Sequence, residues 1–186
     1  MKYFGIFIAI ILVVGVISAL FDSEEETTEP EKVETSAPAE SVVDEDVTVE
    51  VSAAQQTAIE AFESNDFMKF ADSFYSLEGA ERSDIYSSSV EGQIVTWSGI
   101  ITDLETVSDS IIIMGKEDAY NGADWNTLNA DHKELLPYVV VVEMNDPSVK
   151  EGLNKGDNIT LTGEIGARGD VDAGYNWKLY KGEIAN

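Results

Sequence analysis

Five short runs rich in β-branched residues follow Gly92, and they constrain the fold more than any other feature of this chain. Gly, Asn and Asp punctuate the runs, and this pattern favours strands over helices. Five strands with a short helical connection between the third and the fourth are the order of elements typical of an OB-fold. The sequence therefore predicts a mainly β fold, an OB-fold-like Greek-key barrel preceded by short α-helices. The expected strands are Gln93–Leu104, Asp109–Met114, Tyr138–Met144, Asn158–Ile165 and Trp177–Ile184.

A helical period precedes these runs, over residues 52–91. Ser52 and Gln55 have the spacing of a capping box, which predicts a helix that begins there. In the next stretch, apolar residues between Phe67 and Leu77 recur at steps of three and four. Glu81–Tyr86 is expected to form a further helical turn. The apolar face of the second helix should pack on the sheet, or else form a groove for a partner.

Residues 3–21 are nineteen consecutive uncharged, mostly aliphatic residues. A helix of this length spans the roughly 30 Å hydrocarbon core of a bilayer, so we expect a transmembrane anchor. Lys2 is the one basic residue before this segment, which predicts that the N-terminus lies in the cytosol. The expected protein is therefore a single-pass protein of the cell membrane whose C-terminal domain is extracytoplasmic. Cleavage after Ala19 as a signal peptide is the alternative.

The distribution of acidic and aromatic residues distinguishes a tether from a folded domain. Residues 22–51 hold 12 acids and one Lys and lack aromatic residues, which predicts a disordered acidic linker. The expected organisation is an anchor at 1–21, this linker at 22–51, a helical lead-in at 52–91 and the barrel at 92–186.

The folded part, residues 52–186, carries 24 acids against nine basic residues. This charge suits a cationic partner or a divalent metal, or it serves solubility alone. It argues against nucleic acid, because phosphate binding needs clustered Lys and Arg.

Catalysis finds little support in the residue types. The chain has no Cys and a single His, and it lacks a nucleophile elbow or a His-Glu-x-x-His pattern. We therefore expect no enzyme, no catalytic residue, no metal and no cofactor. His132 is expected to be a solvated residue on a short helix.

Two segments resemble a known family. VEGQIVTWSGIITDL (90–104) and LNKGDNITLTGEI (153–165) are similar to the first and fourth strands of tRNA-anticodon-binding-like OB modules, which include exported members of unknown role. Trp97 and Gly99 match the W-x-G pattern of that first strand. The resemblance spans roughly residues 85–185 and implies the fold, whereas it implies little about activity.

The segment 115–137 departs from that family, which usually has a tight hairpin there. A loop of this length is usually functional or mobile, and it contains Tyr120 and Trp125. OB-folds bind ligands across strands two and three, so the segment should flank or cover that groove. Alternatively, Trp125 plugs the mouth of the barrel.

The connection between the last two strands, residues 166–176, combines three glycines with Arg168 and Tyr175. The functional interpretation makes Arg168 an anion contact and Tyr175 a stacking surface, and the alternative is a flexible hairpin. Asp170 and Asp172 lack the further ligands of a calcium loop.

These observations predict a membrane-tethered binding module for a protein, peptide or envelope ligand. The expected ligand-binding residues are Tyr120, Trp125, Arg168 and Tyr175. The alternatives are a single-stranded nucleic-acid-binding OB-fold protein, with aromatic residues stacking on bases, and a structural subunit of an envelope complex. Trp97 is expected to lie in the core.

Overall fold

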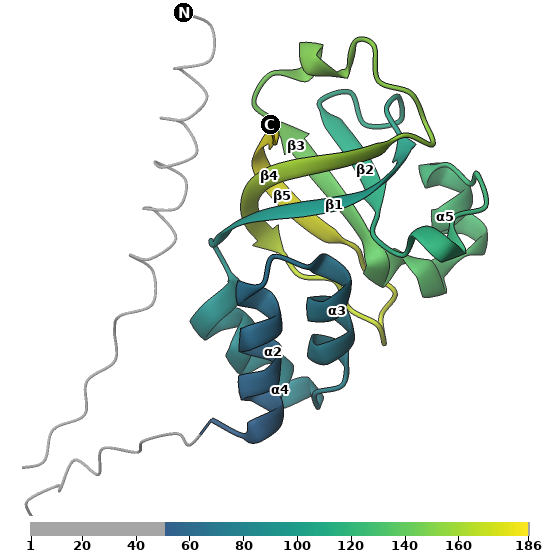
Figure 1. Ribbon diagram of the computed structural model, residues 1–186. Helices are drawn as coiled ribbons and strands as arrows, with labels where there is room; N and C mark the ends of the chain where they lie inside the picture. The colour runs from purple at the N-terminus through teal and green to yellow at the C-terminus, as the bar shows by residue number, and fades with distance from the viewer. Residues whose placement is uncertain (1–50, 186) are drawn as a thin grey trace, which may run out of the picture. The chain divides into compact units, whose positions relative to one another are not determined.

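The computed structural model describes residues 51–185, which fold into a closed barrel of five strands preceded by short helices (Figure 1). The prediction of a mainly β barrel is confirmed, and each predicted strand end lies within two residues of its position in the structure. The strands are β1 (Ile94–Asp103), β2 (Ser110–Met114), β3 (Val139–Met144), β4 (Asn158–Ala167) and β5 (Trp177–Ile184).

The strands close the barrel in the order β1-β2-β3-β5-β4, with β4 pairing back to β1. The β3–β5 pair is parallel and the other four pairs are antiparallel. The β1–β2 ladder has an irregularity between Ile101 and Asp103. Two residues earlier on β1, a Cβ on Gly99 would lie 2.6 Å from the Met114 carbonyl oxygen. A glycine lets the two backbones approach each other.

Within the described residues, three α-helices and a π-helix precede the barrel, namely α2 (Ala53–Glu63), α3 (Phe67–Tyr75), α4 (Gly79–Ile85) and η1 (Tyr86–Val90). The predicted capping box is confirmed. The Ser52 hydroxyl accepts a hydrogen bond from the Gln55 backbone N–H at 3.2 Å, and the Gln55 side chain accepts one from the Ser52 N–H at 2.8 Å. The predicted turn at Glu81–Tyr86 is part of a longer helical segment that ends in a π-helix.

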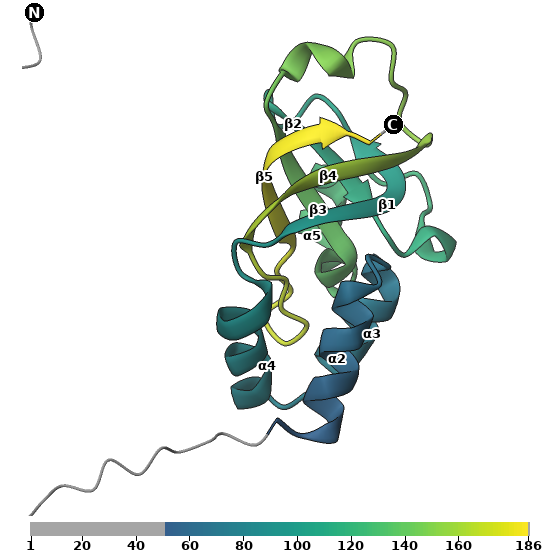
Figure 2. The same cartoon turned by 60° about the vertical axis from the view of Figure 1, so that its left-hand side comes forward.

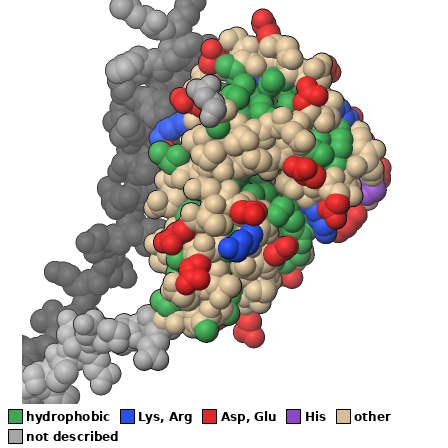
Figure 3. Space-filling model, viewed as in Figure 1, with side chains coloured by type: hydrophobic (Ala, Val, Ile, Leu, Met, Phe, Trp, Pro, Cys, Tyr) green, Lys and Arg blue, Asp and Glu red, His purple; other side chains and the backbone are tan. Residues whose placement is uncertain are grey.

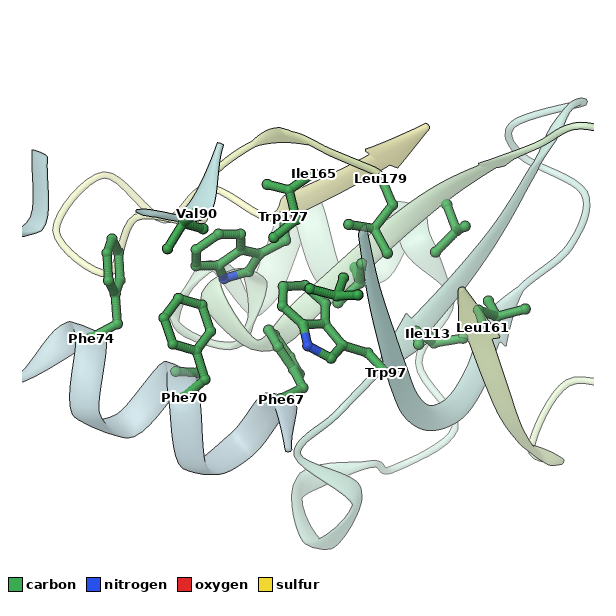
Figure 4. Close-up of a cluster of buried hydrophobic side chains, with 14 of the residues drawn as sticks. Phe67, Phe70, Phe74, Val90, Trp97, Ile113, Leu161, Ile165, Trp177 and Leu179 are labelled. Atoms are coloured by element: carbon green, nitrogen blue, oxygen red, sulfur yellow. The ribbon is translucent and has the colours of Figure 1, made fainter. Parts of the chain in front are cut away.

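The helices lie at one end of the barrel (Figure 2). The apolar face of α3 packs into the barrel core there and closes that end. Phe67 and Phe70 extend from α3 toward Trp97 of β1 and Trp177 of β5, and all four side chains are buried (Figure 4). The ring centroids of Phe67 and Trp97 are 4.6 Å apart, and those of Phe70 and Trp177 are 5.4 Å apart. The prediction that Trp97 belongs to the core is therefore confirmed, and the face of α3 packs on the barrel.

The segment between β2 and β3 is helical and contains η2 (Glu117–Ala119), α5 (Trp125–Asp131) and η3 (Lys133–Tyr138). His132 lies between α5 and η3, so the prediction that it lies on a short helix is wrong. A further short turn, η4 (Pro147–Lys150), follows β3.

Successive side chains of β2 and β3 point to opposite faces of the sheet, and both faces are covered. Ile111 and Ile113 point into the barrel core, whereas Ile112 and Met114 point outward. The outward side chains pack against the segment between β2 and β3 in what we call the outer cluster. Its buried members are Ile112, Met114, Leu128, Leu136, Val139 and Val141. The segment thus covers the outer face of β2 and β3.

The predicted membrane anchor (residues 1–21) and acidic linker (residues 22–51) lie outside the described residues, except for Val51 at the end of the linker. Within residues 51–185, none of the helices combines the length and apolar character needed to cross a bilayer.

Candidate functional site

Two of the four predicted ligand-binding residues, Tyr120 and Trp125, lie in the segment between β2 and β3. Both side chains are half-buried against the outer cluster. Burial raises the pKa of the Tyr120 hydroxyl above its ordinary value. Trp125 begins α5, whose N-cap Asp124 accepts a hydrogen bond from the Thr127 N–H at 2.8 Å. The interpretation in which Trp125 plugs the barrel mouth is wrong, because its side chain packs outside the barrel and the aromatic residues of α3 close the end.

Asp103, at the end of β1, ties this segment to the β1–β2 loop. Its Oδ1 accepts hydrogen bonds from the backbone N–H groups of Glu105 and Thr106, both at 2.8 Å. Its Oδ2 accepts from the Thr106 hydroxyl at 2.8 Å and from the Trp125 N–H at 3.2 Å. Asp103 is only 6% exposed. One buried carboxylate therefore fixes both the loop and the start of α5.

The environment of Asp103 favours its ionised form. Burial is the largest single influence and by itself raises the pKa of this carboxyl. The hydrogen bonds from Thr106, Glu105 and Trp125 together outweigh burial, so the pKa of Asp103 lies below its ordinary value. The negative charge consequently persists at neutral pH.

A hollow of about 510 Å³ opens beside Asp103, where the β1–β2 loop, the start of α5 and the segment before β4 meet. Leu104 and Leu153 contribute apolar surface, and both are half-buried. The remaining lining is polar and carries both signs of charge. It consists of Thr102, Asp103, Glu105, Thr106, Asp124, Asn126, Asn154 and Lys155.

Lys150, at the end of η4, holds the β1–β2 loop in place. Its ammonium donates to the backbone carbonyl of Leu104 at 2.5 Å and to that of Ser108 at 2.9 Å. The carbonyls of Val107 and Ser110 lie 3.3 and 3.4 Å away. The loop thus curls around a single cation, and this arrangement gives the wall of the hollow its shape.

Arg168 and Tyr175 lie in the β4–β5 connection, which packs against α4 and η1. The Arg168 guanidinium donates to the Ser83 hydroxyl at 3.2 Å and lies 5.8 Å from the centre of the Tyr86 ring. Arg82 forms an ion pair with Asp172 in the same connection. Tyr175 is 64% exposed, and its backbone pairs with that of Asp170. These contacts give Arg168 a role in joining the connection to the helices.

The four predicted residues therefore occupy two neighbourhoods, with Tyr120 and Trp125 at the outer cluster and Arg168 and Tyr175 beside α4. Sequence reasoning missed Asp103 and Lys150, which organise the hollow. A usable signal existed for Asp103, since Asp followed by Thr three residues later is typical of a side chain that bonds to the next turn. Nothing in the local sequence marked Lys150, because the carbonyls it binds lie 40 or more residues away.

Carboxylates dominate the charged surface. On the face seen in Figure 3, acidic side chains are spread widely and few basic ones lie among them. Within residues 51–185, no cluster of three or more His, Asp or Glu side chains is placed to hold a metal ion.

No protein-family model matches this chain, and no curated protein matches it either. The resemblance of residues 90–104 and 153–165 to tRNA-anticodon-binding-like OB modules stays a prediction.

Proposed function

We propose that this chain is a membrane-tethered, extracytoplasmic OB-fold module that binds a protein, peptide or envelope ligand without catalysing a reaction. The observation that carries the proposal is the strand order β1-β2-β3-β5-β4 with a parallel β3–β5 pair in a small closed barrel. Small barrels of five strands serve as binding modules on which loops supply the specificity. The apolar segment 3–21 is the basis for the tether.

Two observations favour a ligand other than nucleic acid. OB-folds bind oligonucleotides on the face of strands two and three, and here residues of α5 and η3 cover the outer face of β2 and β3. The charge of residues 52–186 is also strongly negative, with 24 acids against nine basic residues. Phosphates would be repelled by this charge.

Crosslinking on native membranes, followed by mass spectrometry, tests the binding function. The expected result is a reproducible protein or envelope component crosslinked to loops of the barrel. The same preparation from cells that lack the chain is the control. Only self-crosslinks, or none, would refute a binding role.

Protease added to intact cells tests the tether separately. We expect residues 52–186 to be degraded while the cells stay sealed, since the proposal places them outside. Protection in sealed cells followed by degradation in opened cells would place the domain in the cytosol.

A further inference from the structure

We infer that the hollow beside Asp103 is a recognition site for a Lys or Arg side chain of a peptide or protein partner. The inference rests on the proposed binding function and names both the surface and the chemistry of the ligand. Three properties of the hollow carry it, namely its charge, its apolar walls and its rigidity.

The charge of the hollow is net negative. The lining contains three acidic residues, Asp103, Glu105 and Asp124, and a single basic residue, Lys155. The pKa of the Asp124 carboxyl lies below its ordinary value, chiefly because it accepts the hydrogen bond from the Thr127 N–H, and Lys155 contributes to the shift. The pKa of Asp103 is lowered as well. The negative charge therefore persists at neutral pH, which favours a cationic group.

The carboxylates fit an organic cation better than a metal ion. The oxygens of Asp103 already accept four hydrogen bonds from the protein, so its contribution is charge and not coordination. In the described part of the chain, no set of three acidic or histidine side chains converges on one point. An ammonium group carries three N–H donors and a guanidinium group five, and carboxylate and amide oxygens can accept from them without the close convergence that a metal ion requires.

The apolar walls suit the stem of such a side chain. Lys and Arg carry three or four methylene groups, which pack on apolar surface while the charged end stays with polar groups. Leu104 and Leu153 supply this surface in the hollow, and Glu105 lies next to Leu104 in the chain. The amides of Asn126 and Asn154 supply further oxygen acceptors.

The walls are held in place before any ligand arrives. Asp103 and Lys150 fix the β1–β2 loop from two sides. Asp103 also fixes the start of α5 through the Trp125 N–H. A rigid site binds at a lower entropic cost than a loop that must order on binding.

The test is a titration of the purified full chain, in zwitterionic detergent, with a tetralysine peptide. The same peptide acetylated on every side-chain amine is the control ligand. Glu105→Gln is expected to weaken tetralysine binding at least threefold, and Lys155→Met to strengthen it at least threefold. Glu63→Gln on α2 and Lys69→Met on α3 are the matched controls, because they make the same changes in net charge outside the hollow. Each should change tetralysine binding by less than half as much as the corresponding variant in the hollow.

The matched variants separate the hollow from the general acidity of the domain. Equal effects of Glu105→Gln and Glu63→Gln would overturn the site, and so would equal binding of the acetylated peptide or no binding of tetralysine. These outcomes would leave the proposed binding function intact, because that function is tested by crosslinking to a native partner.

Discussion

The Tyr75 hydroxyl of α3 accepts a hydrogen bond from the Trp177 indole N–H of β5 at 2.7 Å. The same hydroxyl donates to the Pro137 carbonyl, also at 2.7 Å. One oxygen thus joins the lead-in helices, the barrel and the end of the segment between β2 and β3. Burial raises the pKa of Tyr75 well above its ordinary value, so the hydroxyl keeps the proton that it donates.

Tyr75→Phe should lower the free energy of unfolding by about 1–3 kcal/mol. The change leaves the buried indole N–H and the Pro137 carbonyl without their partner. Urea denaturation of the full chain measures the loss. Tyr86→Phe is the control, since its ring packs against Arg168 without involving the hydroxyl. Equal losses in the two variants would contradict the role given to Tyr75.

Asp103→Asn should lower stability at neutral pH by about 1–3 kcal/mol, because an amide nitrogen cannot accept the hydrogen bonds that Oδ2 accepts. The folded pKa of Asp103 lies below the unfolded value of about 3.9, so its stabilising effect is present above that pH. The effect is lost as the pH falls through the folded pKa.

The wild-type chain and Asp103→Asn should therefore converge in stability as the pH falls below about 4. Denaturation curves at pH 7 and in that acid range measure this. Asp118→Asn, in the exposed turn η2, should show no such convergence. A gap between wild type and Asp103→Asn that stays constant with pH would contradict the assignment.

Trp97→Ala should lower stability by about 3–5 kcal/mol, because the indole is fully buried among the aromatic residues of the core. Trp125→Ala should cost less, since that side chain is half-buried at the outer cluster. Trp97→Phe should be milder than Trp97→Ala, because the Trp97 N–H has no hydrogen-bond partner among the described residues. Thermal denaturation ranks the three variants, and the reverse order of the two alanine variants would refute this account.

Gly99→Ala should lower stability by about 1–3 kcal/mol, because the new Cβ would lie 2.6 Å from the Met114 carbonyl oxygen on β2. Backbone atoms cannot move aside as a flexible side chain does. Gly79→Ala is the matched control, since a Cβ at the start of α4 has no atom within 4 Å. Thermal denaturation should show an unchanged or slightly raised midpoint for Gly79→Ala. Similar melting temperatures for both variants would contradict the close approach.

Lys150→Met should increase hydrogen exchange in the β1–β2 loop at least tenfold, because the loop carbonyls lose their shared donor. Mass spectrometry of peptides covering residues 104–110 measures the exchange. Lys133→Met, at an exposed position of η3, should leave the loop unchanged. Unchanged exchange in Lys150→Met would show that the loop holds its shape without the ammonium.

Local patterns in the sequence were sufficient to predict the elements of the fold. β-branched runs between turn residues located the five strands, and Ser52 with Gln55 located the start of α2. These signals depend on residues that are close together in the chain. They can therefore be recognised in the sequence without knowledge of the tertiary structure.

The expectation from the sequence was that residues 115–137 flank or cover the face of strands two and three, and only the tertiary structure decided between these alternatives and fixed the contacts. It placed α5 and η3 over β2 and β3, joined Asp103 to Trp125, and brought Tyr75 to Trp177 across 102 residues of chain. It also separated Arg168 and Tyr175 from Tyr120 and Trp125. Contacts of this kind depend on how the closed barrel brings distant segments together, and a period of two or 3.6 residues contains no information about that.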